Sequence, residues 1–169
     1  MTSEEIIMDP RIESPVMTFP AARAALLKLR ASAEGAGLPE TTRLLVEVRA
    51  SQINGCGVCL DMHTRELRAA GEPTAKIDTV ATWREVPYFT EAERAALALT
   101  EASTRLADHP DPVSDHAWQA AAQHYTKPQL AALVIAIATI NAWNRLMVTT
   151  GQTGGHWVEQ VIREDQQST

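Results

Sequence analysis

The segment that most constrains the fold is LAALVIAIATI, residues 130–140, which contains no charged side chain. It follows Thr126 and Gln129, whose spacing is the capping-box pattern that begins a helix. This pattern predicts a helix from 126 to about 147, with apolar residues on nearly every face up to Ile140. Such a helix must be buried all round, and in a chain of 169 residues a subunit interface is one way to bury it. We therefore expect a homo-oligomer.

The rest of the chain also has the spacing of helices. Apolar residues recur every three or four positions, and alternating runs of β-branched residues are missing. Proline or a capping residue opens most segments, and glycine closes several of them. The predicted helices cover 20–37, 39–52, about 56–72, 74–83, 90–106 and 114–124. The expected fold class is all-α.

Length and composition indicate one globular domain, residues 1–169, because 45% of the residues are hydrophobic and 21% are charged. A net charge of -6 without a basic stripe predicts no nucleic-acid partner.

The apolar run 130–140 is shorter than the ~20 residues that span a bilayer. The N-terminus has acidic residues where a signal peptide would have basic ones. We therefore expect a cytoplasmic protein with no membrane partner. No glycine-rich phosphate loop is present, and we expect no cofactor.

Both cysteines, Cys56 and Cys59, lie in NGCGVCLDMH, residues 54–63, and His63 follows the second by four positions. In a helix that begins near Cys56, with Asn54 as its N-cap, these three side chains lie along one face. Helix N-terminal amides favour a thiolate, two sulfurs at this spacing can form a disulfide, and a histidine one turn away can carry a proton. In the cytosol such a pair is more often catalytic or metal-binding than structural. The pattern favours thiol redox chemistry.

Other interpretations of the two cysteines are weaker. They can be small buried residues. With His63 they offer three zinc ligands, but no second pair completes a structural site, and we expect no metal. Covalent haem would need a histidine where Leu60 stands. The spacing leaves open which thiol attacks a substrate, because the helix dipole favours Cys56 and proximity to His63 favours Cys59.

Three segments together carry a specific resemblance: VEVRASQINGCGVCLDMHTRELRAAGE (46–72), WREVPYFTEAERAALALTEA (83–102) and IATINAWNRL (137–146). They resemble the alkylhydroperoxidase D-like branch of the carboxymuconolactone decarboxylase superfamily. The similarity covers about 20–148 and leaves N- and C-terminal arms. It implies a helical, trimer-based oligomer such as a trimer or hexamer, and a CxxC pair that reduces hydroperoxides. Decarboxylases of the superfamily lack this pair, so lactone decarboxylation is not expected.

The resemblance also implies a role for each residue of the motif. Cys59 corresponds to the peroxidatic thiol that attacks the hydroperoxide. Cys56 corresponds to the thiol that forms the disulfide with it and then meets the reductant, which is a dithiol protein or a small thiol. His63 corresponds to the histidine of the proton relay.

Two positions depart from the family pattern. Leu44 stands where the motif has a glutamate, and Val58 stands where the best-known members have a histidine between the cysteines. Both changes remove acid–base groups. Glu47, one turn after Leu44, is our choice for the missing carboxylate, and Glu40, one turn before it, is the alternative.

The favoured function is a thiol-dependent peroxidase that uses Cys59, Cys56, His63 and Glu47. One alternative is a disulfide-exchange adaptor with little peroxidase activity, which the loss of the motif glutamate slightly favours. Another is a non-enzymatic helical oligomer that binds a ligand or partner, with the cysteines as a sensor or as structural residues.

Several further side chains carry expectations. Trp83, Trp118 and Trp143 are expected in the core. The polar run 141–145 interrupts an apolar helix, so it either builds a hydrogen-bond network or reaches solvent. After the glycine-rich TGQTGG, the segment 156–165 is expected to dock through Trp157, Val158, Val161 and Ile162; His156 would reach a neighbouring subunit's site only if this segment crosses to it.

Overall fold

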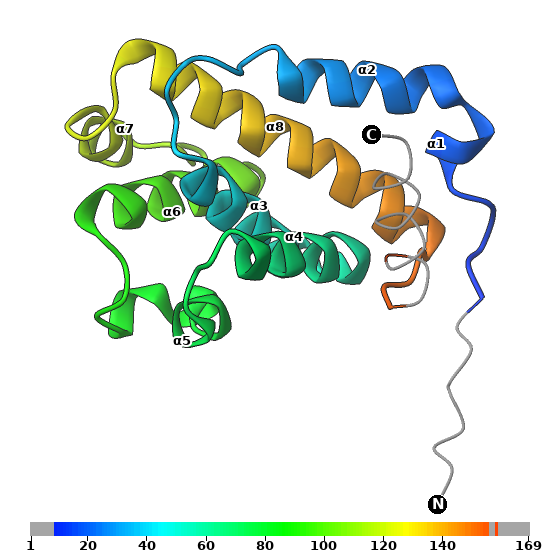
Figure 1. Ribbon diagram of the computed structural model, residues 1–169. Coiled ribbons are helices and arrows are strands. Elements are labelled where there is room, and N and C mark those ends of the chain that lie inside the picture. The colour runs from blue at the N-terminus through cyan, green and yellow to red at the C-terminus, as the bar shows by residue number, and fades with distance from the viewer. Residues whose placement is uncertain (1–8, 156–157, 159–169) are drawn as a thin grey trace, which may run out of the picture.

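The computed structural model describes residues 9–155 and residue 158, and every regular element among them is helical. Figure 1 shows the helices packed around two long ones, α3 and α8. The elements are α1 (Pro15–Thr18), α2 (Pro20–Ala31), α3 (Glu40–Asn54), α4 (Gly57–Ala69), α5 (Thr74–Asp78), η1 (Val80–Glu85, a 3-10 helix), α6 (Glu91–Thr104), α7 (Asp115–Ala122) and α8 (Lys127–Thr150). The all-α prediction is confirmed.

Most predicted helices differ from the structure by up to three residues at their ends, and two differ in other ways. The helix predicted over 20–37 ends at Ala31, because Gly35 and Gly37 take positive φ angles of 84° and 79° in the turn that follows. The element predicted over 74–83 is two short helices, α5 and η1, with a non-helical residue between them. The helix predicted to end near 147 continues to Thr150. The short helix α1 was not predicted.

The central element is α3, which packs against α4, α6 and α8. Its two ends serve different parts of the core. The side chains at its start pack with α5, η1 and α6, and its last turns pack with α1, α4 and α8. This second group contains both cysteines and is called the cysteine cluster below: Val16, Ala50, Cys56, Val58, Cys59, Ile140, Met147 and Val158.

Helix α8 is only half enclosed within one chain. Within one chain, Val134 in the apolar run and Val148 beyond it are each 41% exposed, so the predicted burial on every side would require a second copy of the chain. By length and composition alone α8 is apolar enough to cross a membrane, but half of its most apolar window is buried inside the molecule, as in a core helix. The exposed side of α8 is the part of the helix that a second copy of the chain can cover.

A buried polar network joins the end of α3 to the middle of α8. The Asn54 side-chain amide donates to the amide oxygens of Asn141 (3.0 Å) and Asn144 (2.9 Å). The Asn144 amide, with no exposed surface, donates to Ser51 Oγ at 3.1 Å. Of the two alternatives for residues 141–145, Asn141 and Asn144 therefore form the network. Asn54 is its outermost member and lies two residues before Cys56, so the network holds the turn that carries the first cysteine.

The three tryptophans have different environments. Trp83 is in the core, 6% exposed, and its indole N–H donates to Glu101 at 3.0 Å. Trp143 is half-buried. The expectation is wrong for Trp118, which is 38% exposed because short α7 packs only one side against α6 and α8.

In the C-terminal segment Val158 is fully buried as predicted, whereas His156, Trp157, Val161 and Ile162 lie outside the described residues.

We predict that Asn144→Ala lowers the free energy of unfolding by about 2 kcal/mol, because it removes the hydrogen bonds of Asn144 to Asn54 and Ser51 and leaves a cavity at a fully buried position. The control Thr149→Ala, at an exposed position of the same helix, should change it by less than about 0.5 kcal/mol. Urea unfolding followed by circular dichroism measures both. Equal stability of the two variants would mean that the network does not hold α3 to α8.

We also predict that the protein forms a homo-oligomer in solution, because association would remove the exposed valines of α8 from water; the family resemblance implies a trimer or hexamer. Light scattering coupled to size-exclusion chromatography measures the mass. A mass of 18.4 kDa at micromolar concentration would contradict the prediction.

Candidate active site

The turn between α3 and α4 places both cysteines. Gly55 ends α3 in the left-handed conformation, with φ 69° and ψ 29°, which glycine adopts without steric cost. Cys56 then serves as the N-cap of α4, and its sulfur accepts the backbone N–H of Cys59 at 3.3 Å. The predicted N-cap, Asn54, is wrong: it belongs to the last turn of α3, and its side chain bonds α8 instead.

Cys56 and Cys59 form a disulfide, with Cα atoms 5.4 Å apart. Both are buried, with 2% and 5% of their surface exposed. They differ in what they face, because Cys59 lines a cavity of about 480 Å³ and Cys56 does not. The cavity lies between α2, α4 and α8. Its apolar wall includes Val58, Met62, Ile140, Trp143 and Met147.

His63 lines the same cavity, one helical turn after Cys59. Its Nδ1 atom lies 2.8 Å from Glu66 Oε2 and 3.4 Å from Glu47 Oε2. Two carboxylates beside Nδ1 favour the tautomer with the proton on that nitrogen. The other ring nitrogen, Nε2, has no hydrogen-bond partner within the described part of the chain. It can therefore accept or donate a proton in the cavity.

Glu47 is the carboxylate of α3 that reaches this histidine. It is 3% exposed, and its Oε2 atom also accepts from Arg43 Nη1 at 2.7 Å. Glu40, the alternative from the sequence, has an exposed side chain whose carboxylate pairs with Arg43 at 3.5 Å. The structure thus brings Cys59, His63 and Glu47 to one cavity, and it leaves Glu40 outside.

Glu66 is a site residue that we did not predict. Burial alone would raise the pKa of its carboxyl, but the hydrogen bond from His63 and the charges of His63, Arg30 and Arg43 outweigh burial and lower the pKa. The carboxylate therefore stays ionised beside the histidine. Its spacing from His63, three residues along α4, is a signal that could have identified it.

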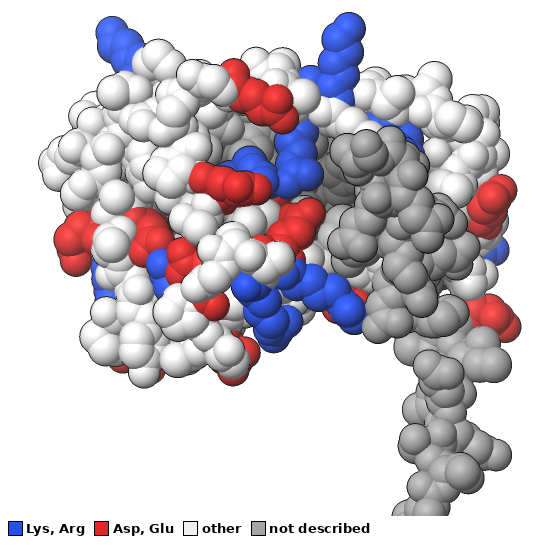
Figure 2. Space-filling view, viewed as in Figure 1, with Lys and Arg blue, Asp and Glu red and all other residues white. Residues whose placement is uncertain are grey.

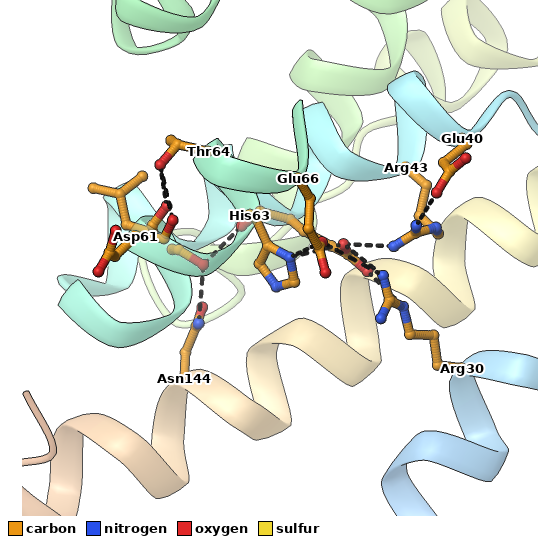
Figure 3. Close-up of polar contacts among 11 residues, drawn as sticks. Arg30, Glu40, Arg43, Asp61, His63, Thr64, Glu66 and Asn144 are labelled. Atoms are coloured by element: carbon orange, nitrogen blue, oxygen red, sulfur yellow. Dashed lines mark hydrogen bonds and ion pairs between the residues drawn. The ribbon is translucent and has the colours of Figure 1, made fainter. Parts of the chain in front are cut away.

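Arg30 is a second site residue that we did not predict, and it comes from α2. Its guanidinium lies 3.4 Å from Glu47 Oε1 and 3.8 Å from Glu66 Oε2. In Figure 3, Arg30 points from α2 toward His63 and Glu66 on α4, with Arg43 of α3 on the same side. No residue of α2 is buried, so these ion pairs are a main tie between that helix and the site.

A second cavity of about 800 Å³ lies beside the first, and Arg30 and Glu66 line both. Charged side chains of both signs surround it, including Glu34, Glu40 and Arg43. Figure 2 shows Lys or Arg and Asp or Glu side chains interleaved around the middle of this face, rather than gathered in separate fields. The surface near the site is therefore mixed in charge.

Glu47, His63 and Glu66 each place a ligand atom within 4.8 Å of the others, close enough to hold a metal ion. Two guanidiniums, however, already pair with the two carboxylates. These guanidiniums supply the positive charge that a cation would bring. The cluster is therefore a charge-compensated set of proton donors and acceptors.

The two departures from the family pattern have a structural context. Leu44 is 1% exposed and packs in the core around Trp83 and Leu97, so it carries out a packing role. Val58 lines the cavity beside Cys59 and makes it more apolar. The family pattern has a carboxylate at position 44 and this chain does not, but Glu47 and Glu66 place carboxylates beside His63.

Comparison with solved structures places this fold among known ones. A protein of unknown function from Agrobacterium tumefaciens, described as a candidate antioxidant defence protein AhpD, matches with a TM-score of 0.80 and 33% identity. The match covers 87% of this chain and 99% of that one. The debrominase Bmp8 matches with a TM-score of 0.73 over 88% of this chain and 79% of its own. At 17% identity that likeness concerns the fold alone.

Sequence comparison gives a consistent result. The uncharacterized protein YdfG of Bacillus subtilis is 38% identical over 111 residues, which cover 66% of this chain and 74% of YdfG. The profile of the carboxymuconolactone decarboxylase family matches residues 18–102, which include α2, α3, α4 and both cysteines. The chain belongs to the carboxymuconolactone decarboxylase family.

Proposed function

We propose that the protein is a thiol-dependent peroxidase that reduces hydroperoxides through Cys59 and Cys56. The observation that carries the proposal is that Cys59, His63 and two carboxylates meet at one cavity. The likeness to a candidate antioxidant defence protein AhpD adds support. We further propose that the enzyme works in the cytoplasm as a homo-oligomer, with a dithiol protein or a small thiol as its reductant.

The reaction begins when the Cys59 thiolate attacks the distal oxygen of the hydroperoxide. The O–O bond breaks, Cys59 becomes a sulfenic acid, and the leaving alkoxide takes a proton from His63 and departs as an alcohol. The sulfur of Cys56 then attacks Cys59, a disulfide forms and water leaves. A dithiol reduces the disulfide and is itself oxidised, which restores both thiols.

His63 moves the protons through Nε2, while Glu47 and Glu66 hold the ring by Nδ1. A nearby carboxylate stabilises the charged imidazolium that forms when Nε2 takes the proton of the Cys59 thiol. Arg30 and Arg43 lower the pKa of the Glu66 carboxyl, and both pair with the Glu47 carboxylate. Glu47 and Glu66 together thus take the part of the glutamate that Leu44 replaces.

The cavity also indicates the kind of hydroperoxide. Its volume of about 480 Å³ is in the range of sites for small organic ligands and far exceeds hydrogen peroxide. Apolar side chains make up most of the wall. An organic hydroperoxide with an apolar body, such as cumene hydroperoxide, therefore suits the site better than hydrogen peroxide.

The disulfide-exchange adaptor remains the second candidate. It is favoured by Leu44 and Val58, which leave fewer acid–base groups near the cysteines than the family pattern has. The cavity beside Cys59 weighs against it, because disulfide exchange with another protein does not need a site for a small molecule. Hydroperoxide consumption compared with the rate of exchange with a free dithiol distinguishes the two functions.

We predict that Cys59→Ser lowers the consumption of cumene hydroperoxide at least about 100-fold, because it removes the attacking thiolate. Cys56→Ser should instead permit one turnover and leave a sulfenic acid on Cys59, which dimedone traps and mass spectrometry detects. A sulfenic acid that forms on Cys56 in the Cys59→Ser variant, with activity retained, would reverse the assignment of the two cysteines.

We predict that His63→Gln lowers the rate of thiol oxidation by about 100-fold, the scale of a lost proton carrier. Glu66→Gln and Glu47→Gln should each lower it by roughly tenfold, because each removes a negative charge beside the imidazole. Glu40→Gln is the matched control, since this exposed residue pairs with Arg43 and does not contact His63; its rate should equal the wild type. Stopped-flow fluorescence measures the rates. If Glu40→Gln slowed thiol oxidation as much as Glu47→Gln and Glu66→Gln, the proposed roles of Glu47 and Glu66 in proton transfer would be wrong.

The pKa of Glu66 gives the pH dependence of its contribution. Because this pKa is below the ordinary value of 4.5, the carboxylate is ionised throughout the range above that value. The ratio of wild-type to Glu66→Gln rates should therefore stay constant from pH 8 down to about pH 5 and shrink only at more acidic pH. A ratio that already falls between pH 8 and pH 6 would show that Glu66 is protonated there.

A further inference from the structure

The segment that follows α8 returns to the helix that carries the cysteines. Gly151 ends α8 in the left-handed conformation, with φ 71°, and the N–H of Gln152 donates to Met147 at 2.9 Å. Figure 1 shows the chain turning here toward the end of α4 that lies next to α3. We call residues 151–155 together with Val158 the strap.

The strap touches α4 directly beside Cys56. A Cβ atom at Gly154 would lie 3.1 Å from the carbonyl oxygen of Gly57 and 3.4 Å from the Cβ of Asp61. Backbone therefore packs on backbone here, with no room for a side chain. The next residue, Gly155, donates its N–H to Asp61 Oδ2 at 2.8 Å.

Asp61 is a firm anchor for the strap. Burial would raise the pKa of its carboxyl, but the hydrogen bonds from Arg65 and from the Gly155 N–H outweigh burial and lower the pKa. The ionised carboxylate accepts from Arg65 Nε at 2.7 Å as well as from Gly155. Hydrogen bonds to a charged acceptor are stronger than those between neutral groups.

The far end of the strap is held by apolar contact. Val158 has no exposed surface and belongs to the cysteine cluster. Cys56 itself lies between two exposed glycines, Gly55 and Gly57, yet only 2% of its surface is accessible. The sulfur is thus close to the protein surface but covered.

The two cysteines consequently differ in access. A small molecule reaches Cys59 through the cavity, which the strap does not line. Cys56 is absent from the described residues that line this cavity, and the strap lies across the start of its helix. A thiolate that attacks a disulfide needs direct access to the sulfur that it attacks.

We propose that the strap gates the reduction of the disulfide and not its formation. The hydroperoxide reaches Cys59 while the strap is closed, and a dithiol protein reaches Cys56 only after the strap lifts. The reductant's thiolate then attacks the Cys56 sulfur, the bond to Cys59 breaks and Cys59 leaves as a thiolate. The second thiol of the reductant resolves the mixed disulfide and frees Cys56. This inference rests on the redox role of the pair in the proposed function.

The test uses the full-length oxidised protein and measures how fast its disulfide is reduced by purified thioredoxin and, separately, by dithiothreitol. Two variants loosen the strap. Asp61→Asn weakens the acceptor for Gly155 with little change of shape, and Gly154→Leu places a side chain where none fits. Asp78→Asn, at an exposed aspartate of α5, is the control. Thermal melts confirm that each variant is folded.

Reduction by thioredoxin should be about tenfold faster in Asp61→Asn and Gly154→Leu, which corresponds to about 1.4 kcal/mol of lost closure energy. Dithiothreitol, which is smaller, should show less acceleration, and the control should match the wild type. Oxidation of the reduced thiols by cumene hydroperoxide should stay within about twofold of the wild type in both strap variants, since the cavity is unaltered.

Equal rates of reduction in the wild type and both folded strap variants would overturn the gate, even if hydroperoxide is consumed. An acceleration of oxidation as large as that of reduction would also overturn it, because the strap would then cover both cysteines. Faster reduction in the variants of a protein that consumes no hydroperoxide would support the gate and remove the peroxidase proposal instead. The two proposals therefore fail separately.

Discussion

The turn at Gly55 is the constraint on which the rest of the site depends. A left-handed residue ends α3 and lets the chain start α4 one residue later, with Cys56 as the cap. This geometry points the first turn of α4 at α8 and the cavity. The amide network from Asn54 to Asn144 then fixes the turn against the longest helix. A short polar network therefore orients a redox pair that is otherwise surrounded by apolar side chains.

The fold separates two tasks around the two sulfurs. Cys59 and His63 face a cavity, where solvent is limited and charges interact more strongly than in water. Cys56 does not line that cavity and lies between two exposed glycines, next to the start of α4 on which Gly154 packs. In the proposed cycle the hydroperoxide meets Cys59 and the reductant meets Cys56, so substitutions near one sulfur can change one half-reaction without changing the other.

Local patterns predicted the helices and the core of the site, and long-range contacts escaped them. The capping box at Thr126 begins α8 as expected, and a capping box at Thr90 begins α6 where a helix was predicted, because such caps depend only on residues three apart. The spacing of Cys59 and His63 likewise fixes their common face. Arg30 could not be found this way, since it reaches the site from a separate helix through tertiary packing. The strap is also non-local, because its contacts with Asp61 depend on where α8 ends.

The charges around His63 have one further consequence. Two carboxylates, Glu47 and Glu66, face two guanidiniums, Arg30 and Arg43, so the cluster is electrically neutral when the imidazole is neutral. In the proposed reaction, the positive charge that the ring gains with the Cys59 proton is balanced by the thiolate left behind, and it disappears when the proton passes to the leaving alkoxide. The net charge of the site therefore stays the same while a proton crosses it.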